Sequence, residues 1–275
     1  MIGSMDHAPA DARPTLRYFE AHLVDHCNLN CRRCGHFSPL ATASSGSFAA
    51  IESYTRDLTR LAELFSAISR IHLMGGEPLL HPGVGDFVRA TRRAFPWAEI
   101  CVVTNGILLP TIPERVWSIL RDDRAVLRLS VYPLNRSAGR QTVEDYAESV
   151  VHRGIRVEVA KVEQFGAYLN VNGDSDPTVA MEACRKSFYC PFLADGRMYI
   201  CVMPAKVRYF NEAYGQRIPD DGYVDIHAAG VTGRIILERL ETPGVACRFC
   251  RSTPLSFDWT LGRDGPEDWV AARAR

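Results

Sequence analysis

Cysteine is the residue type whose spacing in this chain indicates chemistry. Nine of the 275 residues are cysteines, too few for a disulfide-stapled scaffold. Their positions are 27, 31 and 34, then 101, then 184, 190, 201, 247 and 250. An odd number of clustered cysteines without an export signal indicates metal binding rather than disulfides. Cys101 stands alone in the apolar run 100–103 and is expected to be a buried core residue.

The first group has the spacing Cys27-x3-Cys31-x2-Cys34. Three thiolates in one short loop can wrap one corner of a metal cluster. On a cluster of four irons they leave one iron open for a substrate or cofactor. Two other interpretations remain, namely a zinc site completed by His26 or His36 and a set of free cysteines.

The second group surrounds a predicted β-hairpin. Two short apolar strands flank Asp195-Gly196, which is a strong turn signal, so Cys201 follows the hairpin. Cys247-x2-Cys250 comes after a helix-like stretch at 231–240. We expect a second metal site here, with a zinc knuckle as the alternative.

Strands and helices alternate before the second group. Strands are expected at 16–24, 71–74, 99–104, 125–132 and 156–162, and helices at 51–68, 84–95, 113–120 and 142–152. The last of these helices has Thr142 as its expected N-cap and Gly154 just past its end. This alternation predicts an α/β fold with a parallel sheet and outer helices. The number of units fits a partial TIM-like barrel rather than a closed barrel of eight.

The sequence is divided into four expected parts. Residues 1–16 are expected to be disordered or tag-derived, because they are polar and contain Gly3-Ser4-Met5, which is typical of a cloning scar. Residues 17–165 form the partial barrel, 166–260 a small cysteine-rich domain with a β-hairpin and a helix, and 261–275 a C-terminal tail. Clustered Pro, Gly and Asn mark the second boundary.

Charge and composition exclude several classes of protein. Lys+Arg and Asp+Glu both number 32, so the chain lacks the basic excess typical of nucleic-acid binding. Hydrophobic residues make up 47%, which excludes global disorder. No apolar run approaches the roughly 20 residues of a membrane span, and no signal peptide is visible. A cytoplasmic location is therefore expected.

Cys27, Cys31 and Cys34 follow the first expected strand, and in this respect residues 17–165 resemble the radical S-adenosylmethionine (SAM) enzymes. The resemblance implies a partial (β/α)6 barrel and a [4Fe–4S] cluster on these three cysteines. It also implies that SAM binds the open iron and is cleaved to a 5′-deoxyadenosyl radical.

Further motifs carry the same resemblance. Met74-Gly75-Gly76-Glu77-Pro78 is similar to the family's GGEP motif, and Thr104-Asn105-Gly106 and Ser130 follow in order. The implied cofactor-binding residues are Gly75, Gly76, Glu77, Asn105, Ser130 and Phe37. The glycines are expected to let the backbone approach the ligand, and Glu77 to pair with the SAM ammonium. Arg33 stands where the family often has an aromatic residue, so His36 or Phe37 is expected to pack against the adenine.

Residues 184–250 resemble the auxiliary-cluster domains of the superfamily, called SPASM and twitch. Five cysteines suffice for one further [4Fe–4S] cluster. In the favoured assignment its ligands are Cys184, Cys201, Cys247 and Cys250, as in the twitch domains of aminocyclitol dehydrogenases. In the other they are Cys184, Cys190, Cys201 and Cys247. The spare thiol, Cys190 or Cys250, is then the candidate catalytic residue, because aminoglycoside epimerases of the superfamily use a cysteine as hydrogen-atom donor.

The expected substrate is a carbohydrate or an aminocyclitol of natural-product biosynthesis. Hydrogen return by the spare cysteine gives an epimerase, and electron transfer to the auxiliary cluster gives a dehydrogenase. Flavodoxin or ferredoxin is the expected electron donor, and no nucleic-acid or membrane partner is expected. Candidate substrate-binding residues are Arg136, Glu158, Lys161 and Asn211. The alternatives are modification of a ribosomally made peptide and, from another class, a zinc-binding structural or interaction protein.

Overall fold

The computed structural model describes residues 13–42, 47–133, 143–187, 189–262, 265 and 269. Most of the expected segments 1–16 and 261–275 lies outside these residues. The first half of the chain alternates strands and helices. Its elements are β1 (Thr15–Val24), α1 (Ile51–Leu64), β2 (Ala67–Gly75), η2 (Pro78–Leu80), α2 (Val84–Ala94), β3 (Glu99–Thr104), η3 (Leu109–Thr111), α3 (Glu114–Asp122), β4 (Val126–Val131), α4 (Val143–His152) and β5 (Arg156–Lys161).

The second half has shorter elements. They are β6 (Gln164–Leu169), α5 (Pro177–Ser187), β7 (Phe192–Ala194), β8 (Arg197–Tyr199), α6 (Val202–Lys206), α7 (Arg208–Tyr214), β9 (Tyr223–Asp225), α8 (Gly233–Leu240), η5 (Val245–Phe249) and β10 (Cys250–Asp258). The predicted hairpin is confirmed, because β7 and β8 pair antiparallel around Asp195 and Gly196, both of which have positive φ.

One sheet joins the two halves. Its strand order is β5-β4-β3-β2-β1-β7-β8-β9, and β1 to β5 are parallel to their neighbours. Strand β7 adds parallel to β1, so the sheet continues across the expected boundary between the barrel and the C-terminal domain. Strands β6 and β10 form a separate antiparallel pair. The predicted α/β fold with a parallel sheet is confirmed, and the division into domains stays a prediction.

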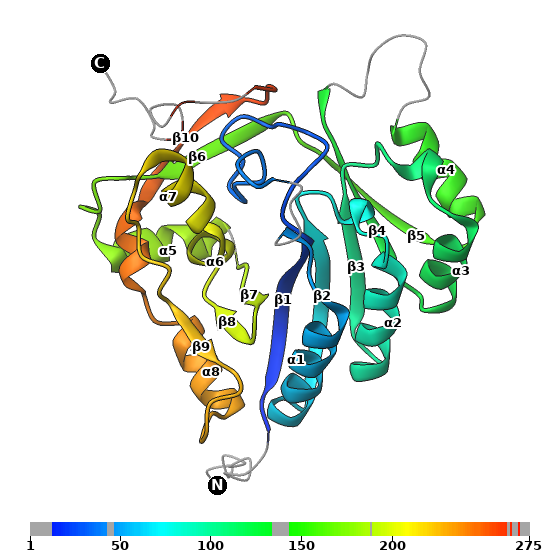
Figure 1. The fold of residues 1–275 in the computed structure, drawn as a ribbon, viewed down its shortest axis with the longest axis horizontal. Helices are drawn as coiled ribbons and strands as arrows, with labels where there is room; N and C mark the ends of the chain where they lie inside the picture. Colours follow the sequence, from blue (N-terminus) through cyan, green and yellow to red (C-terminus); the bar gives the residue numbers. More distant parts are fainter. Residues whose placement is uncertain are drawn as a thin grey trace, which may run out of the picture.

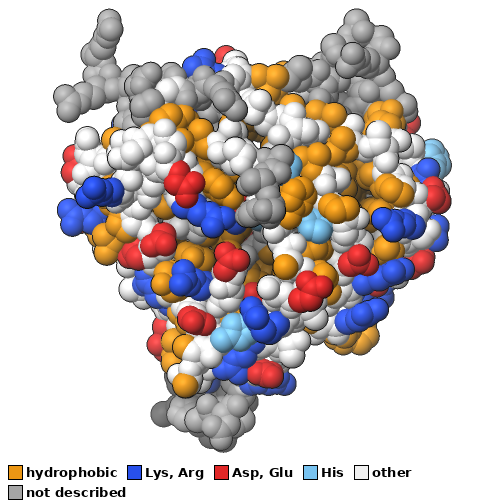
Figure 2. All heavy atoms as spheres, viewed as in Figure 1, with side chains coloured by type: hydrophobic (Ala, Val, Ile, Leu, Met, Phe, Trp, Pro, Cys, Tyr) orange, Lys and Arg blue, Asp and Glu red, His pale blue; other side chains and the backbone are white. Residues whose placement is uncertain are grey.

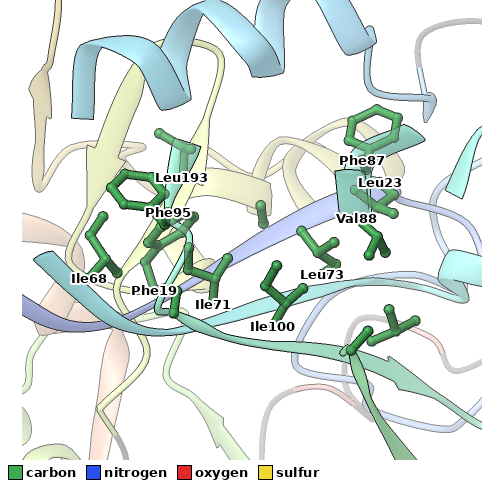
Figure 3. Close-up of a cluster of buried hydrophobic side chains, with 14 of the residues drawn as sticks. Phe19, Leu23, Ile68, Ile71, Leu73, Phe87, Val88, Phe95, Ile100 and Leu193 are labelled. Atoms are coloured by element: carbon green, nitrogen blue, oxygen red, sulfur yellow. The ribbon is translucent and has the colours of Figure 1, made fainter. Parts of the chain in front are cut away.

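The main core lies between the sheet and helices α1 to α3, which cover one side of it (Figure 1). Strand β1 alternates as a half-buried strand should. Phe19, Ala21 and Leu23 point into this core, and Tyr18 and Glu20 face the other side. Figure 3 shows Phe19 and Leu23 among apolar side chains of β2, α2, β3 and β7. Burying one side chain of this size contributes roughly 1.5–3 kcal/mol.

Two expectations about element boundaries need correction. The helix predicted at 51–68 ends at Leu64, and Ile68 lies in β2, which is longer than the predicted strand 71–74. The reason is that Ser66 N–H donates to the carbonyl of Pro14 (2.9 Å), so the chain is already alongside β1 at this point. The predicted N-cap Thr142 lies outside the described residues, and Gly154 ends its helix with φ +77° as predicted.

The surface in Figure 2 carries lysine and arginine side chains interspersed with aspartate and glutamate. This mixture agrees with the formal net charge of zero. Within the described residues, no helix has the length and apolar character needed to cross a membrane.

Candidate active site

The loop after β1 carries the first three cysteines to the end of the sheet where the parallel strands finish (Figure 1). We call Cys27, Cys31 and Cys34 the trio. Chain from beyond β10 holds this loop: Arg32 N–H donates to the carbonyl of Thr260 (3.0 Å), and Gly262 N–H donates to that of Asn30 (2.9 Å). The trio loop is therefore fixed by residues more than 200 positions away, which sequence analysis missed.

Hydrogen-bond donors surround the trio sulfurs. Leu29 N–H donates to Cys27 Sγ (3.3 Å), and Asn105 Nδ2 lies 3.7 Å from the same sulfur. The buried indole N–H of Trp259 and hydroxyl of Ser38 have no hydrogen-bond partner among the described residues. Burial raises the pKa of the Cys31 and Cys34 thiols, and Trp259 near Cys31 and Ser38 near Cys34 each offset part of that rise. Both groups are therefore positioned to donate a hydrogen bond to a thiolate sulfur.

The trio fits an iron–sulfur cluster by the chemistry of its donors. Burial raises the pKa of Cys27 and of Cys31 to about 12, so neither thiol ionises at neutral pH unless a cation binds it. Donors aimed at thiolate sulfurs are a common feature of iron–sulfur sites and tune their reduction potential. In the part of the chain that is described, no three Cys, His, Asp or Glu side chains converge as the ligands of a single ion would.

The GGEP segment follows β2 beside the trio loop. A Cβ on Gly75 would lie 2.1 Å from the carbonyl oxygen of Val24, and one on Gly76 would lie 2.1 Å from that of His26. These glycines therefore let β2 pack against the backbone before Cys27. We expected the glycines to make room for a ligand. The structure shows that they are also needed to avoid a clash with the chain's own backbone at Val24 and His26.

Glu77 is fully buried, and its carboxylate binds the ends of β2 and β3 together. It accepts hydrogen bonds from Leu79 N–H (3.0 Å), Thr104 Oγ1 (2.6 Å) and Asn105 N–H (2.8 Å). Burial raises its pKa to about 7 despite these bonds. Glu77 is not among the residues that line the cavity described next, and its contact with the SAM ammonium stays a prediction.

A cavity of about 540 Å³ opens beside the trio, and we call it the trio cavity. All three trio cysteines line it, together with four of the expected cofactor-binding residues: Gly75, Gly76, Asn105 and Ser130. Phe37 does not line it, because its ring packs against Phe210 and Trp269. His36 does, as do the aromatic side chains of Tyr132, Phe165 and Tyr168, which sequence analysis missed.

The second group of cysteines also converges. We call Cys184, Cys190, Cys201, Cys247 and Cys250 the quintet. All five line one apolar pocket of about 40 Å³, although they come from α5, the segment before β7, the N-cap of α6, and the η5–β10 junction. Burial raises the pKa of all five thiols. Cys101 lies elsewhere and is fully buried in β3, as expected.

A second cavity of about 270 Å³ lies beside the quintet, and we call it the quintet cavity. Four quintet members line it, and Cys247 does not. The two cavities adjoin, since both are lined by Arg33, Gly35, His36, Gly166 and Tyr168. The trio and the quintet therefore line two neighbouring cavities that share a wall.

Two chains of hydrogen bonds run from the sheet to residues that line these cavities, Glu20 and His36. Sequence analysis missed both chains. One runs from Arg70 and His72 on β2 through Tyr18 to Glu20 on β1. It depends on the parallel register of β1 and β2, which sets Tyr18 opposite Arg70 and Glu20 opposite His72. Burial raises the pKa of Glu20 to about 7 and, together with Arg70, lowers that of His72 to about 3.

The other chain runs from Asp25 through His22 to His36. Burial alone would raise the pKa of Asp25, but the hydrogen bond from His22 and the charge of Lys206 outweigh it and lower that pKa. Burial lowers the pKa of His22 and brings that of His36 to about 3. The imidazoles are therefore neutral beside an ionised carboxylate.

The expected substrate-binding residues do not gather at this site. Glu158 pairs with Arg70 (2.7 Å), and Asn211 hydrogen-bonds both backbone groups of Ile218. Neither they nor Lys161 line the two cavities. Arg136 lies outside the described residues.

Residues 22–150 match the family model described as the radical SAM superfamily. These residues are therefore assigned to the radical SAM superfamily, whose domains use SAM and a [4Fe–4S] cluster. The trio loop lies within the matched segment, and the trio cavity is lined by residues of that segment and by residues from 162 to 168.

Curated relatives that match are GTP 3′,8-cyclases. The one from Gloeobacter violaceus is 34% identical over 109 residues, covering 38% of this chain and 32% of the relative. The one from Clostridium perfringens is 30% identical over 92 residues, covering 34% of this chain and 28% of the relative. The matched segment spans about a third or less of the length of these relatives.

Solved structures that match include anSMEcpe with bound AdoMet, with a TM-score of 0.46 and 15% identity over 86% of this chain and 83% of that one. BtrN in complex with AdoMet and 2-DOIA gives a TM-score of 0.38 and 19% identity over 53% of this chain and 56% of that one. Streptococcus suis SuiB gives a TM-score of 0.41 and 14% identity over 53% of this chain and 32% of that one.

Proposed function

We propose that this chain is a radical SAM epimerase acting on a carbohydrate or aminocyclitol, with Cys190 as the hydrogen-atom donor. The observation that carries the proposal is the junction of the two cavities. A substrate in the quintet cavity would have the trio cavity on one side and the Cys190 thiol on another. Removal of hydrogen from one face and its return from the other is what inverts a carbon centre.

The size of the quintet cavity favours a small substrate over a peptide, and its mostly apolar lining includes a few polar side chains. Its volume of about 270 Å³ lies just below the range of typical small-molecule sites, which is roughly 300–1,000 Å³. Polar side chains of Glu20, Arg33 and His36 line it beside apolar ones such as Phe37 and Met203. Such a mixture suits a ring compound with hydroxyl or amino groups.

When bound, SAM and the trio's cluster supply the 5′-deoxyadenosyl radical that removes a hydrogen atom from the substrate. Cys190 then gives its thiol hydrogen to the substrate carbon, so that its S–H bond breaks and a C–H bond forms. One electron from a ferredoxin- or flavodoxin-type donor and one proton from water restore the thiol. Gly75, Gly76, Asn105 and Ser130 are proposed to bind SAM.

Cys184, Cys201, Cys247 and Cys250 are proposed to hold a second [4Fe–4S] cluster, which would supply electron transfer. The surroundings of Cys190 support leaving it free. Burial and then the carboxylate of Glu20 raise the pKa of Cys190. A cluster thiolate at this position would face a charge of the same sign, which is unfavourable in a buried site.

The test is the Cys190→Ala variant, assayed against a panel of sugars and aminocyclitols in D2O. We expect the wild-type enzyme to place solvent deuterium on the inverted carbon. The variant should keep its iron and its 5′-deoxyadenosine formation but yield no epimer. Cys250→Ala is the matched control and should lose about half of the iron. If Cys190→Ala loses that iron instead, Cys190 is a ligand and the proposal fails.

Alcohol oxidation is the second candidate, because Glu20 and His36 line the quintet cavity and offer acceptors for a hydroxyl proton. The electron would then pass to the second cluster. In that case the product has two hydrogens fewer than the substrate and carries no solvent deuterium. Cys190→Ala would then retain activity.

A further inference from the structure

The hydrogen bonds of the Glu20 chain have only one consistent direction. Arg70 is a donor only, so Arg70 Nε–H donates to His72 Nε2 (2.9 Å). His72 therefore carries its proton on Nδ1, which donates to Tyr18 Oη (2.7 Å). Tyr18 O–H then donates to Glu20 Oε1 (2.5 Å). Oε2 of Glu20 has no donor among the described residues, and Glu20 lines the quintet cavity.

The His36 chain also has one direction. Asp25 is ion-paired with Lys206 (2.8 Å) and accepts from Tyr209 Oη (2.6 Å), so it is an acceptor for His22 Nδ1–H (2.8 Å). His22 Nε2 must then accept from Nδ1–H of His36 (2.8 Å). This leaves the lone pair on Nε2 of His36 without a partner in the described part of the chain. His36 lines both cavities.

Both chains thus end in an acceptor beside the quintet cavity, and each is fixed from behind by other side chains. An acceptor in the wall of a cavity is satisfied by water or by a donor group of a bound ligand. A hydroxyl or amino group suits such an acceptor, since each can donate a hydrogen bond.

We infer that the quintet cavity binds a ring compound with at least two hydroxyl or amino groups, one donating a hydrogen bond to Glu20 and one to His36. This inference rests on the proposed function and narrows its substrate class. His36 lies at the junction of the cavities, so the group that it holds is at or next to the carbon that reacts. Tyr18, His72, His22 and Asp25 are positioning residues that act through Glu20 and His36.

The test is ligand binding to the anaerobic holoenzyme, measured by calorimetry without a reductant. The probes are myo-inositol, 2-deoxystreptamine and D-glucosamine, each beside its fully O-methylated derivative. We expect at least one unmodified probe to bind and its methylated counterpart to bind at least about tenfold more weakly. Binding that is equal for the two forms, or absent for every probe, overturns the inference.

Variants locate the contacts. Glu20→Gln presents an amide donor where the wild type presents an acceptor, and His36→Phe keeps a ring on His22 but has no acceptor. Each should weaken binding of the unmodified probe by about tenfold and leave the methylated probe unchanged. Met203→Leu is the matched control, because it lines the same cavity without an acceptor. Wild-type affinity in both test variants contradicts the inference.

Iron content and 5′-deoxyadenosine formation, measured on the same preparations with reductant, separate the two proposals. If iron content and 5′-deoxyadenosine formation are retained while the unmodified and methylated probes bind equally well, only this inference fails. If they are absent in the wild-type enzyme, the proposed function fails.

Discussion

The carboxylate of Glu77 accepts three hydrogen bonds from residues at the ends of β2 and β3, and no solvent reaches it. Glu77, which belongs to the GGEP motif, therefore holds the ends of β2 and β3 in register beside the trio cavity. Its effect on the site passes through Asn105, whose side chain lies 3.7 Å from Cys27 Sγ.

Glu77→Ala should consequently destabilise the protein even without cofactors. Three buried donors would lose their acceptor, and we expect the free energy of unfolding to fall by about 3 kcal/mol or more. Denaturant unfolding of the apoprotein measures this change. Glu63→Ala is the control, since Glu63 is exposed and its pair with Arg60 contributes about 1 kcal/mol or less. Equal stability of the two variants would show that Glu77 has no such structural role.

Cysteine spacing and the resemblance to radical SAM enzymes predicted the trio, Gly75, Gly76, Asn105 and Ser130 as site residues, and all of them line the trio cavity. Neither the spacing nor the resemblance revealed Glu20, His22, His36 and Tyr18 as connected groups. Those contacts depend on strand register and on tertiary packing, which local patterns do not encode. The polar, even-numbered positions 18, 20 and 22 inside an apolar strand were the available signal, because polar residues facing into a barrel need partners.

The strands and helices of the first half were predicted because their apolar periodicity is strong. The pairing of β7 with β1, and of residues beyond β10 with the trio loop, could not be predicted, because both join segments more than 150 residues apart. The approach of β2 to the backbone at the end of β1 is also sterically constrained. The backbone before Cys27 passes so close to β2 that only glycine fits at positions 75 and 76.

Gly76→Ala should therefore disturb the trio loop. Its Cβ would meet backbone atoms of His26 and Asp25, which cannot move aside as a flexible side chain can. We expect a loss of about 2 kcal/mol or more in the free energy of unfolding and a lower iron content after reconstitution. Gly35→Ala is the control, since nothing lies within 4 Å of the Cβ it would add. Wild-type stability and iron in Gly76→Ala would contradict this packing account.

At the scale of the whole molecule, one sheet brings the trio and the quintet to adjoining cavities. Strand β7 joins the C-terminal hairpin to β1, and the trio loop leaves that same strand. The β7–β8 hairpin lies between Cys190 and Cys201, whereas Cys184, Cys247 and Cys250 come from α5, η5 and β10. The proposed mechanism requires a small substrate within reach of both groups.

The most direct test is the iron and sulfide content per chain after anaerobic reconstitution. It is measured for the wild-type protein and for a variant in which Cys27, Cys31 and Cys34 are all replaced by Ala. Two four-iron clusters predict about eight irons in the wild type and about four in the variant, which should no longer form 5′-deoxyadenosine. About four irons in the wild type would contradict a cluster at the quintet. Zinc without iron would contradict the radical mechanism as a whole.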